Sequence, residues 1–505
     1  MQMQLNGLNN KKILHNMNPI KRIFLLLIAF SLAIGNLTAQ RVLRLEDALA
    51  IAAESSPDIK RVKLNLIRSQ ESLKAQLASQ KSNFSFNINP LSFSNDRSFD
   101  EYTNEWYSRN SLSSAGTFTV AQPIPMTDGV ISLNNRLNWQ KTYSEINDKE
   151  LKTFTNNLYL SYNQPLFTYN QQKMALNELE LDMENSQMSY DMQLLSLERI
   201  VAQSFYNVYQ RQMSLEIAKE ENANQQASYE VIKNKVEGGL QSLAELYQAE
   251  LNLANSNSSV QNAEVALLNA KDELKITLGL DLSEEIMVLS SISIEPVPID
   301  LDQAIQYGLE NRMEIRQREI DIENAEFNLI RTQALNEFKG NLQLQVGLFG
   351  DNEQFQNIYE SPNDNEQVGL SLQIPIFDWG EKKARIKAVE AQIKTQELTL
   401  EDQKIDIVSN IRQVHRSLQN LLNQIEIAEQ SSRNSQLTYD INFEKYKYGD
   451  LTGMELSQYQ NQLSQSKIDL ANAQISYKLE VLNMKIQTLY DWETLNSIVP
   501  AAYKK

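Results

Sequence analysis

The chain contains four long stretches without a glycine or a proline, and these stretches constrain its fold most. They are residues 168–237, 240–278, 381–448 and 454–499. Each is rich in Gln, Glu, Leu, Lys, Asn and Ala, and most of these residue types favour helices. A helix of about seventy residues is roughly 100 Å long, because each residue adds about 1.5 Å. No compact globular core needs such a length, so we predict extended helical hairpins.

The spacing of apolar residues within these stretches predicts coiled-coil packing. In the third stretch the steps between apolar residues alternate between four and three, as in coiled coils. The residues that follow this spacing are Ile407, Ile411, Val414, Leu418, Leu421, Ile425 and Ala428. The opposite faces carry Gln, Asn, Ser and Glu, so we expect each helix to touch water on part of its circumference.

The sequence also repeats itself over most of its length. Residues of the two helical regions match at a constant offset of 210 positions. Matched pairs are Pro165 and Pro375, Phe167 and Phe377, Gly239 and Gly449, and Glu245 and Glu455. Residues 45–49 match 301–305 at an offset of 256 instead. The first copy therefore carries about 46 additional residues before Pro165, and the segment 281–298, with two prolines, is the expected linker between copies.

Two regions between the helices have the alternating pattern of β-strands. Within 83–167, Phe84, Phe86 and Ile88 alternate with Ser85 and Asn87, and the region 341–377 alternates in the same way. Period-two alternation predicts strands with one apolar and one polar face. A transmembrane barrel with a wet interior requires this pattern, and a sheet on a soluble core would produce it too. The additional residues are expected to include a further hairpin of strands 117–120 and 130–139, turned at 127–129.

The first forty residues have the features of a signal peptide. Lys11, Lys12, Lys21 and Arg22 precede an apolar run, 23–34, and Ala39 supplies a small residue before a cut at Gln40. Met17 is an alternative start. A membrane anchor is the competing interpretation, but the run is shorter than the ~20 residues that a span needs. No later stretch is apolar enough for a spanning helix, so a membrane portion would have to be a closed barrel.

Composition excludes several classes of function. The chain has no cysteine, which excludes disulfides, thiol catalysis, Cys-metal sites and a lipid-modified N-terminal Cys. Its formal net charge of −17 disfavours binding to nucleic acid. The sequence contains no GxSxG, Walker A, HExxH or Rossmann motif. We therefore predict that the protein is not an enzyme and that it holds no cofactor and no metal.

Several short motifs resemble those of a known family. They are residues 45–49 (Leu-Glu-Asp-Ala-Leu), 164–167 (Gln-Pro-Leu-Phe), 374–380 (Ile-Pro-Ile-Phe-Asp-Trp-Gly), and the turns 238–242 and 448–452. Their order and duplication behind a signal peptide resemble the TolC family of outer-membrane efflux proteins, over roughly residues 41–492. The resemblance implies a mainly α-helical chain with a transmembrane β portion, in which a helix, a β-hairpin and a helical hairpin occur twice.

The expected domain organisation follows from the repeat and the resemblance. It comprises the signal peptide (1–39), repeat 1 (40–280, with strands in 83–164 and a helical hairpin 168–278), the linker (281–298), repeat 2 (299–492, with strands in 341–377 and a helical hairpin 380–490) and a tail (493–505). The resemblance implies a homotrimer whose chains contribute four strands each to one β-barrel, with the helices forming a long coiled-coil α-barrel. Four strands cannot close a barrel alone, and open edges are not tolerated in lipid.

The resemblance also implies two kinds of site at the helical turns. A periplasmic adaptor protein is expected to contact the tip turns, formed by Gly238, Gly239, Leu240, Gly449, Asp450, Leu451 and Thr452. The periplasmic entrance is expected to be held by Glu245, Tyr446, Glu455 and Gln458. Leu451 departs from the family pattern, in which a basic residue pairs with the acids. For Glu245 and Glu455 the competing interpretation is an acid near a helix N-terminus, where the helix dipole favours negative charge.

Aromatic and proline residues mark the corners between strands and helices. Pro165, Phe167, Pro375, Phe377 and Trp379 are expected at the membrane interface, with Trp379 in an aromatic belt. Asp378 is expected to cap the helix that follows it.

Taken together, the sequence predicts a passive exit channel in the outer membrane, with its helical part in the periplasm. It would serve a tripartite efflux or type I secretion system, with an adaptor, an inner-membrane pump and outer-membrane lipid as partners. The competing hypothesis is an exported structural coiled-coil protein without a pore.

Overall fold

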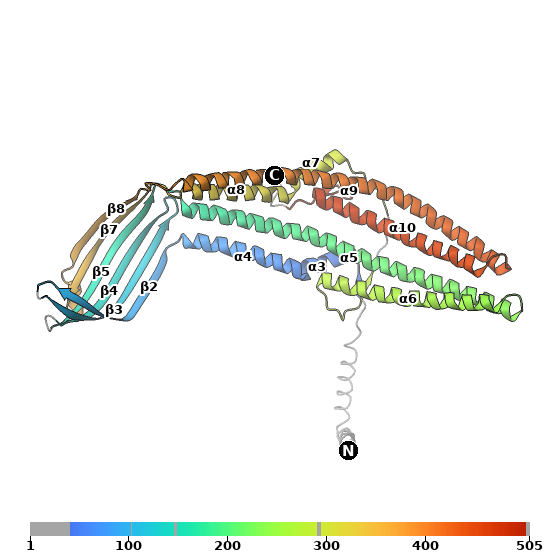
Figure 1. Cartoon of the computed structure of the whole chain (residues 1–505), viewed down its shortest axis with the longest axis horizontal. Helices are drawn as coiled ribbons and strands as arrows, with labels where there is room; N and C mark the ends of the chain where they lie inside the picture. The colour runs from blue at the N-terminus through green and yellow to red at the C-terminus, as the bar shows by residue number, and fades with distance from the viewer. Residues whose placement is uncertain (1–40, 103, 146–148, 290–293, 501–505) are drawn as a thin grey trace, which may run out of the picture. The chain divides into compact units, whose positions relative to one another are not determined.

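The described chain consists of long helices, short connecting elements and one large antiparallel sheet (Figure 1). The computed structural model describes residues 41–102, 104–145, 149–289 and 294–500. The predicted signal peptide, part of the linker and the end of the tail lie outside these residues. The chain divides into two compact units. Unit 1 contains the described residues up to Pro57, Ser196–Pro296 and Leu418–Leu482, and unit 2 contains Asp58–Leu195, Val297–Ser417 and the described residues from Asn483 onward.

Long helices form two hairpins. The first pairs α5 (Gln171–Glu237) with α6 (Leu243–Leu278), and the second pairs α9 (Glu381–Tyr448) with α10 (Gly453–Thr488). Helices α5 and α9 have 67 and 68 residues, close to the lengths of the Gly- and Pro-free stretches. The lack of helix breakers therefore accounts for their length.

Each copy begins with two helices, whereas the sequence suggests a single leading helix. In the first copy, α3 (Leu45–Ser55) is followed by α4 (Pro57–Ser79), since Ser56 before the proline is extended, with ψ 129°. In the second copy, α7 (Leu301–Asn311) is followed by α8 (Met313–Gln333). Here Arg312 is extended, with ψ 120°, although no proline follows it. Its guanidinium binds Gln487 Oε1 at 2.7 Å, so a tertiary contact accompanies this break.

The described residues contain a sheet of six strands, all antiparallel, in the order β2-β3-β4-β5-β7-β8. The strands are β2 (Asn83–Asp100), β3 (Glu105–Ile124), β4 (Gly129–Ser144), β5 (Lys149–Leu166), β7 (Lys339–Asn352) and β8 (Asn363–Gln373). The four strands implied by the resemblance are therefore too few. The predicted additional hairpin is present as β3 and β4, which are much longer than 117–120 and 130–139 and lie inside the sheet.

Short elements complete the described chain. They are β1 (Arg41–Leu43), β6 (Ile286–Val288), β9 (Tyr490–Asp491), β10 (Asn496–Ser497) and the 3-10 helix η2 (Phe355–Tyr359). Strand β6 lies in the expected linker and pairs in parallel with β1, so this segment is partly structured. Strand β8 ends at Gln373, four residues short of the expected strand region, and Pro375 follows with no amide hydrogen to donate.

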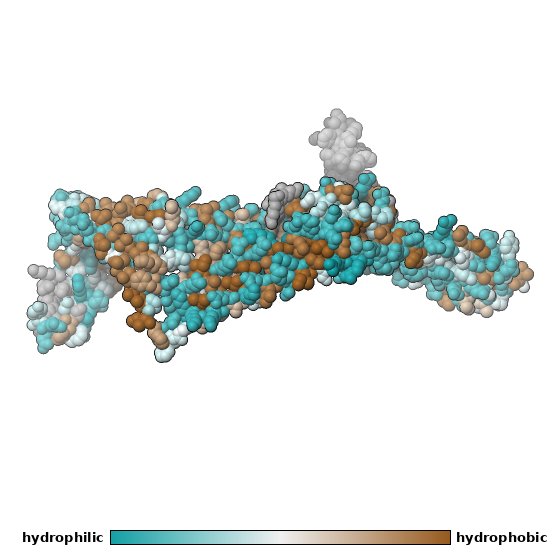
Figure 2. Space-filling model, turned by 90° about the horizontal axis from the view of Figure 1, so that it is seen from above, coloured by the Kyte–Doolittle hydropathy of each residue, from teal (hydrophilic) through white to brown (hydrophobic). Residues whose placement is uncertain are grey.

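Cross-strand pairing gives the sheet one apolar and one polar face, as the alternation predicts. One apolar row crosses five strands at Phe84, Val120, Leu133, Leu160 and Val346. The adjacent polar row includes Ser85, Thr119 and Asn134, and the Thr119 hydroxyl donates to Asn134 Oδ1 at 2.8 Å. Hydrophobic side chains gather over the sheet in Figure 2. Many of them are exposed, including Phe84 (68%) and Leu370 (60%).

Each unit has its own apolar cluster. In unit 2, Met188, Met313, Ile320, Leu489 and Val499 form one core. In unit 1, the corresponding cluster consists of Ile232, Tyr439, Tyr446, Leu456 and Leu463, which come from α5, α9 and α10. None of the helices in the described ranges is both long and apolar enough to cross a membrane.

Candidate functional site

The two turns between the long helices have the same backbone geometry. Gly239 and Gly449 follow the ends of α5 and α9 with positive φ angles of 73° and 93°. The amide of Leu240 donates to the Lys235 carbonyl at 2.7 Å, and the amide of Asp450 donates to the Lys445 carbonyl at 3.0 Å. These are glycine-dependent helix C-caps, in which the left-handed residue turns the chain back on itself. The repeated glycines of the sequence thus mark equivalent turns.

Most of the expected adaptor-contacting residues are exposed. Gly238, Gly239, Leu240, Gly449, Asp450 and Thr452 all lie on the surface of the turns. Leu451 is different, because its side chain is partly buried and packs against the apolar cluster of unit 1. At the position where the family pattern has a basic residue, this chain therefore has an apolar contact.

The two acids after the turns are held differently. Glu455 forms a capping box with Thr452, whose amide and hydroxyl donate to Glu455 Oε2 at 3.0 and 2.8 Å. These hydrogen bonds lower the pKa of Glu455. Glu245 donates its amide to Ser242 Oγ at 3.4 Å, and its carboxylate lies on the side of α6 that faces Gly453 of α10. The geometry of Glu455 fits helix capping, and the entrance role of both acids stays a prediction.

Tyr446 is the most deeply buried of the expected entrance residues, with 1% of its side chain exposed. Its hydroxyl donates to the Ser228 carbonyl at 3.1 Å and accepts from Ser228 Oγ at 2.9 Å. Lys235 Nζ donates to the Tyr446 carbonyl at 3.0 Å and lies 5.4 Å from the centre of its ring. We call these three residues the Tyr446 cluster. It joins α5 of the first copy to α9 of the second, and burial raises the pKa of Tyr446.

Further polar contacts join α5 to α10 at positions farther from the helical turns than the Tyr446 cluster. Lys467 Nζ binds both oxygens of Glu220 at 2.9 Å, and Asn224 donates to Gln460 Oε1 at 3.0 Å. Gln458, which was expected at the entrance, is exposed, whereas its neighbour Gln460 is buried against α5.

Two further features of unit 1 lie along the same helices. Ser464 donates to Glu221, whose pKa is raised by burial. A surface cavity of about 630 Å³ lies beside these contacts and is lined by residues such as Tyr209, Met213 and Lys467.

The strand-to-helix corners combine strained backbone with exposed aromatic rings. Phe167 and Trp379 both have positive φ angles, 59° and 54°. The ring of Phe167 lies 5.0 Å from that of Phe338, and the ring of Phe377 lies 4.7 Å from that of Trp379, which is 91% exposed. Large exposed rings at both corners fit the expected position at a membrane interface, which remains a prediction.

The helices after the corners are capped in two different ways. Asp378 accepts from the amides of Gly380 and Lys382 at 2.9 and 3.1 Å, so it caps α9 as predicted. In the first copy, Asp128 from the β3–β4 turn accepts from the amides of Gln171 and Gln172 at 3.3 and 3.2 Å. The additional hairpin therefore supplies part of the cap of α5.

The sequence that forms these turns and corners matches a known protein family. A family model described as outer membrane efflux protein matches residues 130–280 and 304–486, which is well over half of the chain. The chain belongs to the outer membrane efflux protein family. The predicted resemblance to the TolC family is thereby confirmed, and with it the expected location in the outer membrane.

The curated relatives of this chain are distant. It is 24% identical over 208 residues to the probable outer membrane lipoprotein SilC of Salmonella typhimurium, covering 41% of this chain and 44% of SilC. It is 20% identical over 289 residues to the cation efflux system protein CusC of Escherichia coli K12, covering 57% of this chain and 62% of CusC. The matched region thus spans only about half of the length of these relatives.

Solved structures share the fold over nearly the whole chain. The Campylobacter jejuni CmeC outer membrane channel superimposes with a TM-score of 0.67 at 14% identity, covering 88% of this chain and 85% of CmeC. The open state of the Neisseria gonorrhoeae MtrE outer membrane channel gives 0.64 at 15% identity, with 88% of each chain covered. The chain therefore has a TolC-like fold, mainly helical with a sheet.

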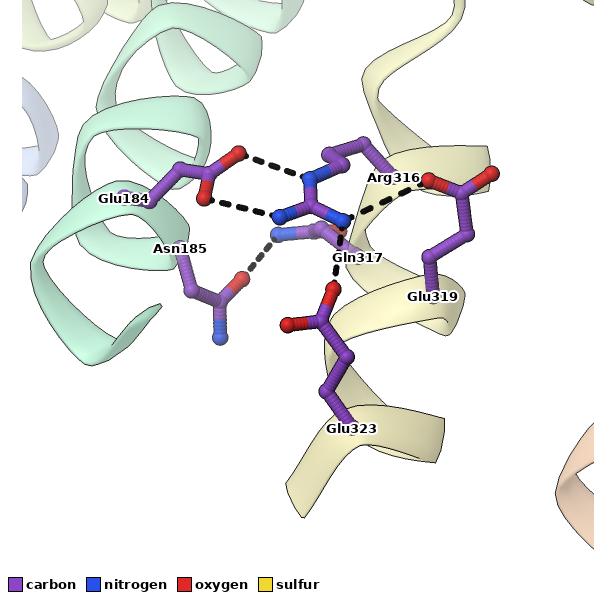
Figure 3. A network of polar contacts seen from close by, with 6 residues as sticks. All are labelled: Glu184, Asn185, Arg316, Gln317, Glu319 and Glu323. Carbon is purple, nitrogen blue, oxygen red and sulfur yellow. Dashed lines mark hydrogen bonds and ion pairs between the residues drawn. The ribbon is translucent and has the colours of Figure 1, made fainter. Parts of the chain in front are cut away.

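A polar network that the sequence did not reveal connects the two sequence repeats of the chain in unit 2 (Figure 3). Arg316 of α8 binds Glu184 of α5 with two hydrogen bonds of 2.8 and 3.1 Å, and its third nitrogen binds Glu323 at 2.7 Å. These contacts raise the pKa of Arg316. Beside it, Gln317 donates to Asn185 Oδ1 at 2.7 Å. Bidentate pairing fixes the relative rotation of α5 and α8 as well as their distance.

Ser228 and Lys235 were also missed, because they have no motif of their own. Tyr446 matches Val236 at the repeat offset, so the repeat gives no hint that it would contact α5. The one available signal was Lys235 in the last turn of a helix, where a cation interacts favourably with exposed carbonyl groups.

Proposed function

We propose that the protein is the outer-membrane exit channel of a tripartite efflux system. It would act as a homotrimer through which substrates pass passively. The observation that carries this proposal is the duplicated helical hairpin with matched turns in a chain of the outer membrane efflux protein family. An inner-membrane pump would supply energy, and a periplasmic adaptor would bind the tip turns. Because the chain offers no catalytic motif, selectivity would depend on the entrance.

The trimer and its barrel rest on a physical argument. The sheet of the described residues has two edge strands, β2 and β8, whose outer backbone groups would be unpaired in lipid. Barrels need about eight strands to enclose even a packed interior, so one such sheet cannot close. Several copies must therefore join their sheets, and three is the number that the family resemblance implies.

The entrance would be held mainly by contacts within one chain. The Tyr446 cluster and the Lys467–Glu220 pair join the α5–α6 hairpin to the α9–α10 hairpin. Leu451 adds apolar packing where charge would otherwise act. Opening would require α9 and α10 to separate from α5, which breaks these contacts.

The proposal is tested by deleting the gene in the native host and measuring sensitivity to substrates of efflux pumps. Metal cations are the first substrates to test, because curated relatives are named for cation efflux. We expect increased sensitivity and intracellular accumulation, both restored by the wild-type chain. A deletion strain that stays as resistant as its parent to a wide substrate panel, in a host lacking a second copy, would argue for the structural coiled-coil alternative.

A further inference from the structure

The additional hairpin makes this sheet wider than the resemblance implies. In the described residues, β3 and β4 are inserted between β2 and β5 and are paired along almost their full lengths, from Arg109 to Ile124 of β3. They are central strands of the sheet, with neighbours on both sides. A loop folded away from the sheet would leave β2 to pair with β5 instead.

The inserted strands have the same two faces as the rest of the sheet. On the apolar side, Phe118 and Val120 of β3 pair with Phe86 and Phe84 of β2, and Leu133 of β4 pairs with Leu160 of β5. On the polar side, the Thr119–Asn134 hydrogen bond joins the two inserted strands. Residues 83–95, 110–124 and 153–166 contain no charged side chain, so β3 resembles β2 and β5, the strands on either side of the inserted hairpin, in this respect. Such strands suit a wall between lipid and water.

The turn of the inserted hairpin also contacts the end of β5 and the start of α5. Besides the two amides held by Asp128, Gln164 donates to the Thr127 carbonyl and Asn170 donates to the Pro125 carbonyl, each at 2.6 Å. Asp378 caps α9 locally, whereas its counterpart at the repeat offset is Thr168, which lacks a carboxylate. The first copy thus uses the inserted hairpin for two amides of the first turn of α5, while the neighbouring Asn170 accepts from the Lys173 amide at 2.8 Å.

The two edges of the sheet complement each other. The described sheet has an even number of strands that alternate in direction, so β8 runs opposite to β2. Strand β2 of a second protein chain can therefore pair with β8 in antiparallel fashion. Both edges carry exposed apolar residues, such as Phe84 and Phe86 on β2 and Val368 and Leu370 on β8. These residues lie on the same face, since cross-strand pairing connects them row by row. The occupant that fits each edge is therefore another copy of this chain.

We propose that three copies join β2 to β8 in a closed wall of eighteen strands, in which the inserted hairpins are full members. This rests on the proposed function, which supplies the membrane setting and the trimer. With strands about 4.8 Å apart and tilted by about 40°, eighteen strands give a backbone diameter of about 36 Å, against about 24 Å for twelve. Barrels of 16–18 strands keep an aqueous channel. The exit is thus too wide to select small solutes, and selection is left to the helical turns.

Disulfide crosslinking of the full-length trimer tests this wall directly, because the natural chain has no cysteine. Within one chain, Ser85→Cys with Thr119→Cys is expected to form a disulfide, because these residues are paired neighbours on β2 and β3. Ser85→Cys with Ser161→Cys is expected not to form one, because β3 and β4 separate these positions. Peptide mass mapping reads out both. The reverse pattern, or no Ser85–Thr119 link, overturns the proposal.

Between chains, Ser85→Cys is combined with Gly369→Cys, Ser371→Cys or Gln373→Cys, which all lie on the polar face of β8. At least one pair is expected to give covalent dimers and trimers on a denaturing gel. The matched control pairs Ser85→Cys with Leu370→Cys, on the opposite face, and should give none. Absence of all three links overturns the edge pairing. Sensitivity of the native host to efflux substrates tests the proposed function separately. A channel that restores resistance but gives the wrong crosslinks would therefore refute only the eighteen-stranded wall.

Discussion

At the residue scale, the contact between the two helical hairpins depends on a few buried polar groups. Tyr446 makes two hydrogen bonds to Ser228, 218 positions away in the sequence, and Lys235 binds its carbonyl. A buried polar group that loses its partner costs about 1–3 kcal/mol, more than the net value of the bond itself. Substitutions of these residues should therefore strongly affect how readily the two helical hairpins separate.

Tyr446→Phe keeps the ring and removes the hydroxyl, leaving the buried Ser228 hydroxyl without its acceptor. We expect the closed arrangement to lose about 1–3 kcal/mol, which would increase the open fraction and the mean conductance. Tyr448→Phe is the matched control, because Tyr448 is 82% exposed and should tolerate the change. Single-channel recordings compare the two. Equal conductance of both variants and the wild type would show that Tyr446 does not hold the entrance.

Glu221 gives unit 1 a dependence on pH. Burial raises the pKa of its carboxyl above the ordinary value of 4.5, so the folded state binds a proton more readily than the unfolded state. The stability contributed by this group is therefore present at low pH and is lost as pH rises through the raised pKa.

Glu221→Gln should accordingly raise the thermal midpoint at pH 7.5 and change it little at pH 4, since Ser464 can still donate to the amide oxygen. The exposed Glu216→Gln is the control and should shift neither midpoint. Circular dichroism of the trimer in detergent at both pH values measures this. An equal shift at pH 4 and pH 7.5 would contradict the titration of Glu221.

At the element scale, the two sequence repeats differ in their helix caps and in the number of strands that each contributes to the sheet. The caps of α5 and α9 use Asp128 and Asp378, one from a distant turn and one from a neighbouring residue. The sheet contains two strands from the second copy and four from the first. Equivalent helices thus begin from different surroundings.

Removing the Asp128 part of the cap by Asp128→Ala should cost the first turn of α5 about 1 kcal/mol, which corresponds to about fivefold faster exchange of the Gln171 and Gln172 amides. Asp128→Asn should retain slow exchange, because an asparagine side chain caps almost as well. Hydrogen exchange followed by mass spectrometry over residues 171–174 compares them. If exchange is equally slow in all three proteins, the hairpin does not cap α5.

The sequence could predict the long helices and the repeat but not the full sheet. Helices α5 and α9 follow from the lack of glycine and proline over 168–237 and 381–448. Strand β3 begins at Glu105, where Glu-Trp-Tyr-Ser-Arg-Asn-Ser shows no clear alternation. It becomes a strand because β2 and β4 pair with it on both sides. Contacts such as Ser228 to Tyr446 and Glu184 to Arg316 join distant segments, and no local pattern announces them.

At the scale of the whole molecule, the family, the two-faced sheet and the matched turns all point to a conduit across the outer membrane. The outer end would be a wide wall of β-strands, and control would lie at the helical turns. The assembled protein is therefore expected to form a pore.

Single-channel recording in planar bilayers would detect such a pore, using purified full-length protein whose trimeric mass has been verified. We predict discrete conductance steps in the wild type and larger steps or longer openings in Tyr446→Phe. If verified trimers of both proteins insert into the bilayer and produce no steps, the protein is not a channel.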